Sequence, residues 1–153
     1  MKIIKNKREK KRLGRSDKLD LPDLGIFGVD SKIDTGAYSC SIHCSRIEVV
    51  EKAGLTLLHF ILLDPSHSAY RNKSFYFKNF KEKRVKNSFG QAERRFVIKT
   101  PIRIFGKSYN TEFSLSNRGN LRFPLLLGRK LLKKGFVVDV SKIDLSYKNK
   151  MMS

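Results

Sequence analysis

The sequence predicts an all-β fold: a small closed barrel or sandwich with one short helix near its C-terminal end. Short apolar segments recur along the chain, and Gly, Pro, Asn, Asp and Ser separate them at intervals typical of turns. Residues 129–134 have the pattern of a helix, which ends before Gly135, a residue type that commonly terminates helices. The length of 153 residues fits one compact domain that needs no disulfides.

The expected strands follow one another from residue 26 onward. Their apolar side chains alternate with polar ones or form short runs bounded by turn residues. The predicted strands are residues 26–33, 39–50, 55–63, 74–80, 96–100, 101–105, 109–115, 125–127 and 136–140. Three consecutive aromatic residues, 75–77, alternate between the two faces of their strand, so at least one set is expected in the core.

The N-terminal residues differ from the rest in composition. Residues 1–18 hold nine Lys and Arg against two Asp and Glu, a net charge of +7, and show no apolar periodicity. Such a segment is typical of a flexible tail. We therefore expect a basic flexible tail at residues 1–18 and a single domain at residues 19–153, with a core that begins near Leu21, Leu24 and Ile26.

The formal net charge of +19 predicts an acidic partner. Nucleic acid, an anionic membrane surface and an acidic peptide would all be attracted by this field, and charge alone does not choose between them. No apolar stretch of about 18 residues is present, so we expect no membrane-spanning segment and no membrane partner. The N-terminus lacks the apolar region of a secretory signal, and two cysteines are few for a disulfide scaffold, which favours the cytoplasm.

The candidate catalytic motif is the tripeptide Asp-Thr-Gly at residues 34–36. It directly follows the predicted strand at residues 26–33. By itself the tripeptide is short enough to occur by chance, and Asp and Gly are also common turn residues. A second feature makes the motif more specific, because residues 123–132 combine an apolar strand, Gly128 and the start of the predicted helix.

This order of features resembles the monomer of retropepsin-type aspartic proteases, in which a late apolar strand packs beside the catalytic loop and its Gly allows close backbone approach. In more detail, the chain is similar to the family historically labelled "ATP-dependent zinc protease". That family resembles the retropepsins and is associated with glutamate ligases that add oligoglutamate tails. The similar blocks are residues 32–37, 86–90 with 93–98, 111–118 and 123–132. The resemblance runs from about residue 24 to about residue 140.

The resemblance implies aspartic chemistry in a homodimer. An aspartic protease needs two carboxylates that share one proton. This chain has a single Asp-Thr-Gly, so Asp34 would supply one carboxylate and a second copy of the chain the other. Thr35 resembles the family residue whose hydroxyl joins the two loops across the symmetry axis. Gly36 permits a tight turn beside the carboxylates, and Ala37 is small enough for a packed loop.

The same family closes a hairpin over its substrate, and residues 83–93 are the candidate for this flap. If the substrate is a glutamate-rich tail, Lys and Arg side chains in the cleft would pair with its carboxylates. The candidate substrate-binding residues are Ala37, Ser88, Gly90, Arg94, Arg95, Arg118 and Arg129. The expected partners are an acidic peptide or protein substrate, a second copy of the chain and, through the basic tail, nucleic acid.

Metal and cofactor chemistry has little support in the residues. A catalytic zinc site needs three protein ligands and an open position, and the three histidines include no His-Glu-x-x-His helix. Cys40, His43 and Cys44 are close in sequence, but a fourth ligand is not apparent. The chain also has no Gly-rich loop of the kind that binds ATP phosphates. We expect no metal and no cofactor.

Two other functions are consistent with the sequence. A basic β-type module that binds nucleic acid or associates with ribosomes would account for the net charge, with the aromatic residues 75–77 stacking on bases. A catalytically silent relative would keep the fold as a binding domain, although the intact motif at residues 34–36 argues against it. Peptide cleavage that is lost in Asp34→Asn would distinguish the protease from the nucleic-acid-binding module and from the silent relative.

Overall fold

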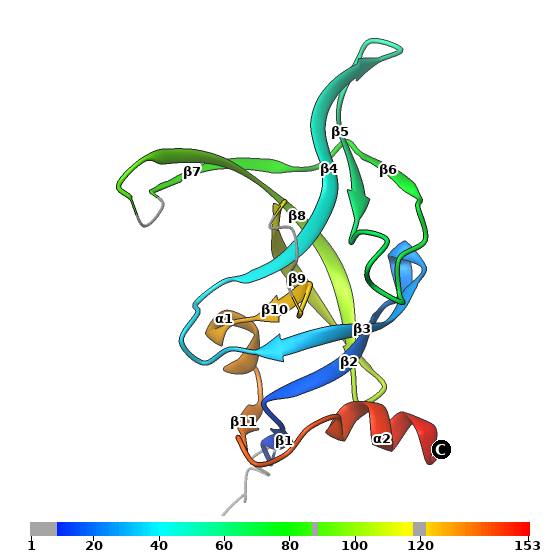
Figure 1. The fold of residues 1–153 in the computed structure, drawn as a ribbon, viewed down its shortest axis with the longest axis vertical. Helices are drawn as coiled ribbons and strands as arrows, with labels where there is room; N and C mark the ends of the chain where they lie inside the picture. The colour runs from blue at the N-terminus through cyan, green and yellow to red at the C-terminus, as the bar shows by residue number, and fades with distance from the viewer. Residues whose placement is uncertain (1–8, 87–88, 118–121) are drawn as a thin grey trace, which may run out of the picture.

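The computed structural model describes residues 9–86, 89–117 and 122–153, and strands dominate it (Figure 1). The strands are β1 (Lys11–Leu13), β2 (Ser16–Leu21), β3 (Ile26–Ile33), β4 (Cys40–Lys52), β5 (Leu55–Leu62), β6 (Ser74–Phe77), β7 (Lys81–Lys86), β8 (Ala92–Ile104), β9 (Lys107–Ser116), β10 (Leu125–Leu127) and β11 (Phe136–Val138). The helices are the short 3-10 helix η1 (Pro22–Leu24), α1 (Arg129–Leu132) and α2 (Leu145–Met151). Within the described part of the chain, no helix has the length and apolar character needed to cross a membrane.

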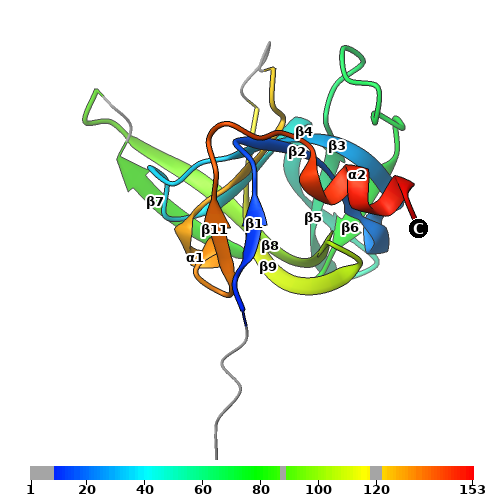
Figure 2. The same cartoon turned by 90° about the horizontal axis from the view of Figure 1, so that it is seen from below.

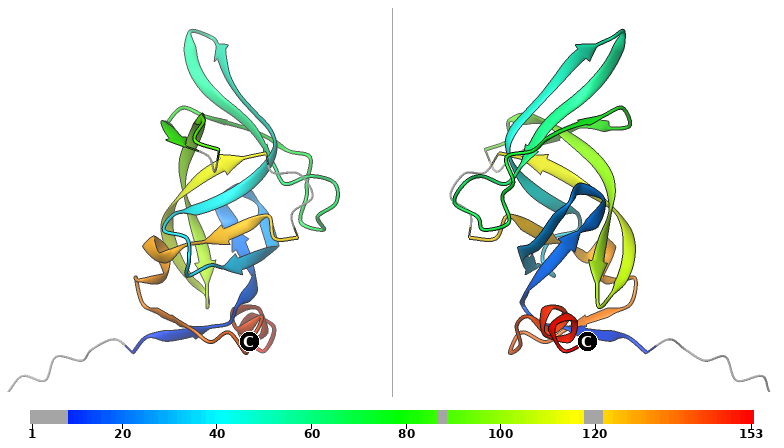
Figure 3. Two further views of the ribbon diagram at one scale, coloured as in Figure 1. Left: turned by 60° about the vertical axis from the view of Figure 1, so that its left-hand side comes forward. Right: turned by 90° about the vertical axis from the view of Figure 1, so that its right-hand side faces the viewer.

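The strand pairings form a ring. In order around it, β10 pairs with β3, β3 with β2, β2 with β8, β8 with β9, β9 with β4, and β4 with β10 again. β5 and β6 extend the sheet from β4 beyond the ring, and Figure 3 shows the β4–β5 hairpin as a long projecting arm. The predicted all-β class is confirmed, in the form of a ring of paired strands rather than a regular barrel.

The short strand β10 brings the site together. It pairs in parallel with β3 and antiparallel with β4, so it lies between the two strands that flank residues 34–39. Leu125 and Leu127 are completely buried, whereas Leu126 between them is half-buried, so one face of this strand lies in the core. On β3, Val29 and Ile33 are buried while Lys32 is exposed, which is the alternation of a strand with one face in the core.

Most of the predicted strands are present with shifted ends, and two differences are larger. Residues 96–100 and 101–105 were expected as two strands, yet β8 runs through both without a break. Pro101, which has no N–H to donate to a ladder, lies opposite Asn110 of β9. β7 was not predicted as a strand, because its charged residues give no apolar pattern. Its pairing with β8 holds it in an extended conformation instead.

The N-terminal segment is structured from Lys11 onward, so the predicted tail boundary at residue 18 is too late. β1 pairs in parallel with β11, and Leu13 is completely buried. β2 pairs with β3, and Asp17 is buried as well. The segment is mostly charged, so its few buried residues do not form an apolar pattern that the sequence could reveal. Residues 1–8 lie outside the described part of the chain, and for them the tail stays a prediction.

The helix α2 was not predicted, and its contacts explain why. The backbone N–H groups of Ser146 and Tyr147 donate to the Asp17 carboxylate at 2.9 and 3.1 Å. Lys150 pairs with Asp20 at 2.7 Å, and Figure 2 shows α2 packed at the end of the ring near β2. Burial raises the pKa of Asp17, although the backbone hydrogen bonds oppose this change. The helix therefore depends on residues from the other end of the chain.

Candidate active site

Asp34 begins the loop that joins β3 to β4. Leu127 of β10 lies opposite Ile33 at the end of β3, and its carbonyl accepts the Asp34 N–H at 2.9 Å. β10 also pairs with the start of β4 through Leu125 and Ile42. Both ends of the loop are therefore attached to the same buried strand.

Gly128 allows α1 to approach this loop closely. A Cβ atom at Gly128 would lie 2.6 Å from the carbonyl oxygen of Tyr38, so any larger residue would displace the backbone. The first N–H groups of α1 donate to the loop, from Arg129 to the Ala37 carbonyl at 2.8 Å and from Lys130 to the Tyr38 carbonyl at 2.9 Å. These N–H groups have no acceptor within the helix, so the loop satisfies them. The close approach expected at the glycine of the late strand is confirmed.

The Asp34 carboxylate is held by the backbone of its own loop. The carboxylate Oδ1 accepts the Gly36 N–H at 2.9 Å, and the backbone carbonyl of Asp34 accepts the Ala37 N–H at 3.2 Å. A Cβ atom at Gly36 would lie 3.2 Å from Oδ1, so glycine leaves the carboxylate room. Asp34 is half-buried, whereas Thr35 and Gly36 are exposed. The carboxylate is oriented and still accessible from outside.

Asp34 and Ala37 lie in the wall of a cavity of about 560 Å³. The loop after β3 and helix α1 form one side of it, and residues of β7, β8 and β9 form the other. This volume is within the range of ligand-binding clefts. The carboxylate of the predicted Asp-Thr-Gly motif thus lies in the wall of a cavity large enough to hold a ligand.

The cavity lining is strongly cationic. It includes two carboxylates, Asp34 and Glu112, and its basic side chains are Lys83, Arg95, Lys99, Lys130 and Lys134. Five positive charges against two negative charges leave a net charge of +3 around one opening. Such a lining attracts and orients anionic ligands.

The predicted flap is a hairpin formed by β7 and the first part of β8. Gly90 in its turn has a φ angle of 77°, a conformation that favours glycine. Lys83 and Arg95 pair directly across the hairpin, and both line the cavity. Figures 1 and 2 show the hairpin projecting on the same side of the molecule as the loop between β3 and β4. The predicted Ser88 and Arg118 lie outside the described residues.

Two predicted arginines are placed away from the cavity lining. Arg94 is adjacent to Arg95 on β8, and neighbouring residues of a strand face opposite sides. Its guanidinium pairs with Glu82 at 2.5 Å and lowers the pKa of that carboxyl. Arg129 donates from Nη1 to the Thr35 carbonyl at 3.0 Å, so it supports the loop and does not form part of the cavity wall.

Sequence reasoning missed most of the cationic lining. Lys99 lies four residues beyond the predicted Arg95. Because side chains alternate along a strand, both residues face the same side of β8. Lys130 and Lys134 are four residues apart, the spacing of neighbours on a helix surface. Only the pairing of β7 with β8 brings Lys83 to the same opening.

The cysteines are buried structural residues. Cys40 and Cys44 of β4 are both free thiols, and burial raises the pKa of each. Cys40 lines the cavity beside Asp34, but a thiol whose pKa is raised is a poor nucleophile.

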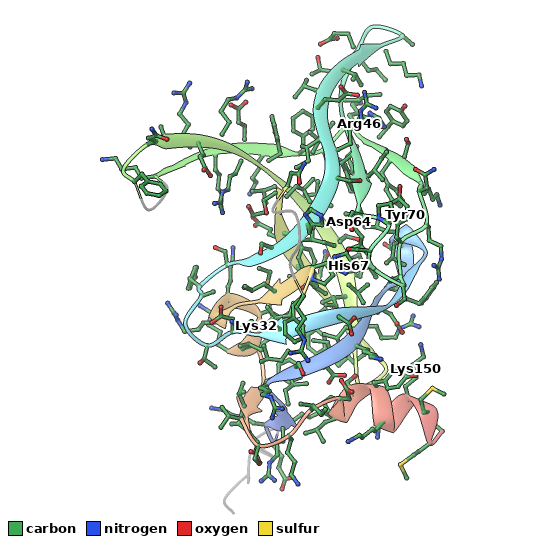
Figure 4. The ribbon with its side chains drawn as sticks, viewed as in Figure 1. Lys32, Arg46, Asp64, His67, Tyr70 and Lys150 are labelled. Carbon is green, nitrogen blue, oxygen red and sulfur yellow. The ribbon has the colours of Figure 1, made fainter. Side chains whose placement is uncertain are left out.

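His43 is engaged on a different part of the molecule. Its Nε2 lies 2.7 Å from Asp64 Oδ2, and His67 Nε2 lies 3.6 Å from the same oxygen. Figure 4 labels Asp64 and His67 near each other. Hydrogen bonds from Ser66, and then from His43, lower the pKa of Asp64 to about 2. Among the residues that the structure describes, no group of three or more His, Cys, Asp and Glu side chains is arranged to hold a metal ion.

The ring of strands, the Asp-Thr-Gly loop and the close approach of α1 through Gly128 define a retropepsin-like protein. The chain belongs to the RimB-like family: the model of this family, described as the retropepsin-like aspartic endopeptidase RimB, matches residues 12–149. The matched residues include the loop, the hairpin and the whole cavity lining.

Curated relatives carry a different name. A probable alpha-L-glutamate ligase from Desulfotalea psychrophila is 33% identical over 131 residues, and another from Shewanella pealeana is 28% identical over 129 residues. These matches cover 85% and 84% of this chain, which spans only 28% of the length of each relative. A solved structure of a Legionella pneumophila protein of unknown function is also similar, with a TM-score of 0.65 and 26% sequence identity. That match covers 89% of this chain and 98% of the other.

Proposed function

We propose that this chain is one half of a homodimeric aspartic endopeptidase in which each copy contributes Asp34. The observation that supports this most directly is a half-complete site: the Asp34 carboxylate lies in the cavity wall on a backbone-fixed loop, and the sequence has no second Asp-Thr-Gly. The other acid of the lining, Glu112, already has two lysine partners. The second carboxylate would therefore come from another copy.

The chemistry of the dyad follows from two close carboxylates. They cannot both ionise easily, so one keeps a proton and the apparent pKa values belong to the pair. The ionised member takes a proton from a water molecule, whose oxygen then attacks the peptide carbonyl carbon. The protonated member donates its proton to the carbonyl oxygen, and the tetrahedral intermediate collapses as the amine leaves with a proton.

The exposed part of the loop fits a two-fold contact. Thr35 and Gly36 are exposed, and Tyr38 is 51% exposed, so the loop has free surface beside the carboxylate. A two-fold axis places the same residues against each other, which would bring two Asp34 side chains together. The hydroxyl of Thr35 is proposed to bridge the two loops.

We propose an acidic, glutamate-rich peptide or protein tail as the substrate. The net charge of +3 in the lining favours a chain of carboxylates over a neutral one. The curated relatives are named probable alpha-L-glutamate ligases, which supports a link between this domain and glutamate polymers. The β7–β8 hairpin, which carries Lys83 and Arg95, would close over the bound peptide as a flap.

We propose the cytoplasm as the compartment. Both cysteines are free and buried, although thiols in a secreted domain of this size usually form disulfides. Detection of the two thiols by alkylation of the unfolded protein taken directly from cells would test this.

The central experiment measures cleavage of a glutamate-rich peptide by the wild type and by Asp34→Asn. Removal of a catalytic carboxylate should lower kcat by about a hundredfold to ten-thousandfold while leaving the fold intact. Both reactions contain a metal chelator, so that any metal-dependent contaminant is silent. Circular dichroism and mass in solution confirm that the variant is folded.

Asp30→Asn is the matched control, because it makes the same chemical change four residues earlier, on strand β3 and outside the cavity lining. It should retain wild-type cleavage. Chelator-resistant cleavage that persists in Asp34→Asn would overturn the proposed mechanism.

A nucleic-acid-binding role has weaker support. Phe75 is buried and stacks on Phe60 with 5.4 Å between ring centroids. Tyr76 stacks on His59 at 4.6 Å, and Lys52 lies 4.4 Å from the centre of the same ring. These rings already have partners within the protein, although Tyr76 is 44% exposed. RNA binding through the basic tail stays a prediction, and salt-dependent binding that Asp34→Asn retains would support it.

A further inference from the structure

Glu112 is the second carboxylate of the cavity lining, and two lysines from different elements pair with it. Lys130 also lines the cavity, whereas Lys81 lies outside the lining. Its Oε1 lies 3.6 Å from Lys81 Nζ of β7 and 3.6 Å from Lys130 Nζ of α1. Lys99 of β8 pairs directly opposite Glu112 of β9, and side chains opposite each other in an antiparallel pair share a face. One carboxylate thus links the base of the hairpin to the helix that supports the catalytic loop.

The environment keeps Glu112 ionised. Partial desolvation opposes its charge, but the positive charges of Lys130, Lys81 and Lys83 outweigh this and lower the pKa of Glu112. The Glu112 side chain is 24% exposed, whereas Lys81 and Lys130 are 67% and 48% exposed. The lysines can therefore move to another anion, while the carboxylate is more confined.

We propose that Glu112 occupies a carboxylate-binding subsite formed by Lys81, Lys83 and Lys130, and that an acidic side chain of the substrate competes with it for these lysines. The inference rests on the proposed function, because it assigns a subsite of the same cleft. Glu112 is then a specificity-determining residue. When Glu112 releases its lysines, an acidic peptide can form new ion pairs with them, whereas a neutral peptide cannot.

The competition has a measurable direction. Glu112→Gln removes the internal carboxylate and leaves the lysines free, so an oligoglutamate peptide should bind about threefold to tenfold more tightly at low salt. The same change should lower KM and leave kcat nearly unchanged, because Glu112 does not touch the reacting atoms in this assignment. Added salt should reduce the difference, because it screens partly exposed charges.

The binding test uses the Asp34→Asn background, in which the bound peptide is not cleaved. The dissociation constant of a fluorescent oligoglutamate peptide is measured by anisotropy with and without Glu112→Gln, at low and high salt. The matched control is Glu82→Gln, which removes the same charge from the opposite face of the hairpin, where Glu82 pairs with Arg94. An oligoglutamine peptide of equal length reports any effect that does not depend on charge.

Tighter oligoglutamate binding with Glu112→Gln, but not with Glu82→Gln, supports the subsite. Unchanged or weaker binding in a folded Glu112→Gln variant overturns it. Lys81→Gln provides a second variant at a mostly exposed position, so it keeps the test valid even if Glu112→Gln does not fold. It should weaken binding about threefold, and wild-type binding by this variant would also overturn the subsite.

The outcomes separate the subsite from the proposed enzyme. If the wild type does not cleave the peptide but Glu112→Gln still tightens its binding, the subsite stands and the protease function fails. If the wild type cleaves the peptide and Glu112→Gln changes neither KM nor the dissociation constant, only the subsite fails.

Discussion

At position 128 the chain has space only for a hydrogen atom. A Cβ there would lie 2.5 Å from the Ser39 carbonyl oxygen, on the loop that follows Asp34. The φ angle of Gly128 is −98°, which any residue can adopt, so the requirement comes from space and not from backbone conformation. The contact sets how closely α1 supports the loop that carries Asp34, so it bears on the proposed function.

Gly128→Ala should therefore damage both stability and cleavage. We expect a loss of about 1 to 3 kcal/mol in the free energy of unfolding, typical of overpacking, together with reduced kcat. Urea denaturation and peptide cleavage measure the two effects. The control is Gly106→Ala in the turn between β8 and β9, where φ is 73° and nothing lies within reach of a new Cβ. This control should lower the free energy of unfolding by about 1 kcal/mol and leave cleavage unchanged. An equal loss of kcat in both variants would contradict a specific role of Gly128.

At the scale of single residues, Arg94 and Arg95 also show what a strand does to neighbouring charges. Arg95 faces the cavity and Arg94 faces Glu82 on the outside, because side chains alternate along β8. The sequence offered the two arginines as equivalent candidates. The pairing of the hairpin separates their roles.

At the scale of elements, α2 depends on the N-terminal strand β2. The Asp17 carboxylate accepts hydrogen bonds from the first turn of α2, and it is 1% exposed. A buried acceptor of this kind stabilises the N–H groups that a helix leaves unpaired at its start. The Asp17 side chain is therefore one of the contacts that join α2 to the N-terminal strands, beside the Lys150–Asp20 pair.

Asp17→Ala should loosen α2. Two N–H groups lose their acceptor, so we expect a loss of about 2 to 4 kcal/mol in the free energy of unfolding. Hydrogen exchange at residues 145–151 should become faster than in the wild type. Asp23→Ala, an exposed change on η1, is the control and should have little effect. Wild-type protection of α2 in Asp17→Ala would show that packing alone holds the helix.

At the scale of the whole molecule, the proposed dimer means that activity requires two copies of the chain. One copy contributes one Asp34 carboxylate, so a dimer with a single intact motif lacks half of its dyad. The cavity lining and the loop belong to each copy alone, but in the proposed dimer the catalytic water would need both copies.

Subunit mixing tests this arrangement. Wild-type protein is unfolded in urea with an equal amount of Asp34→Asn protein, and the two are refolded together at a constant wild-type concentration. Random pairing leaves about half of the wild-type chains in intact dimers, so activity should fall to about half. The control is the same mixture combined after separate refolding and assayed at once, in which activity should be unchanged. Full activity after joint refolding would mean that single copies are active.

The features that could be predicted from the sequence are those formed by contiguous residues. The Asp-Thr-Gly loop at residues 34–36, the strand–glycine–helix order at residues 123–132 and the all-β class can all be recognised from local pattern, because strand alternation and turn chemistry act over a few residues. These features were enough to indicate the family.

The tertiary structure decided which charges meet. Asp17 reaches Ser146 across 129 residues of chain, and Glu112 meets Lys81 and Lys130 from two different elements. Arg129, expected in the cleft, donates instead to Thr35. No local pattern encodes such contacts, because the partner of a charged side chain depends on strand pairing and helix docking elsewhere in the fold.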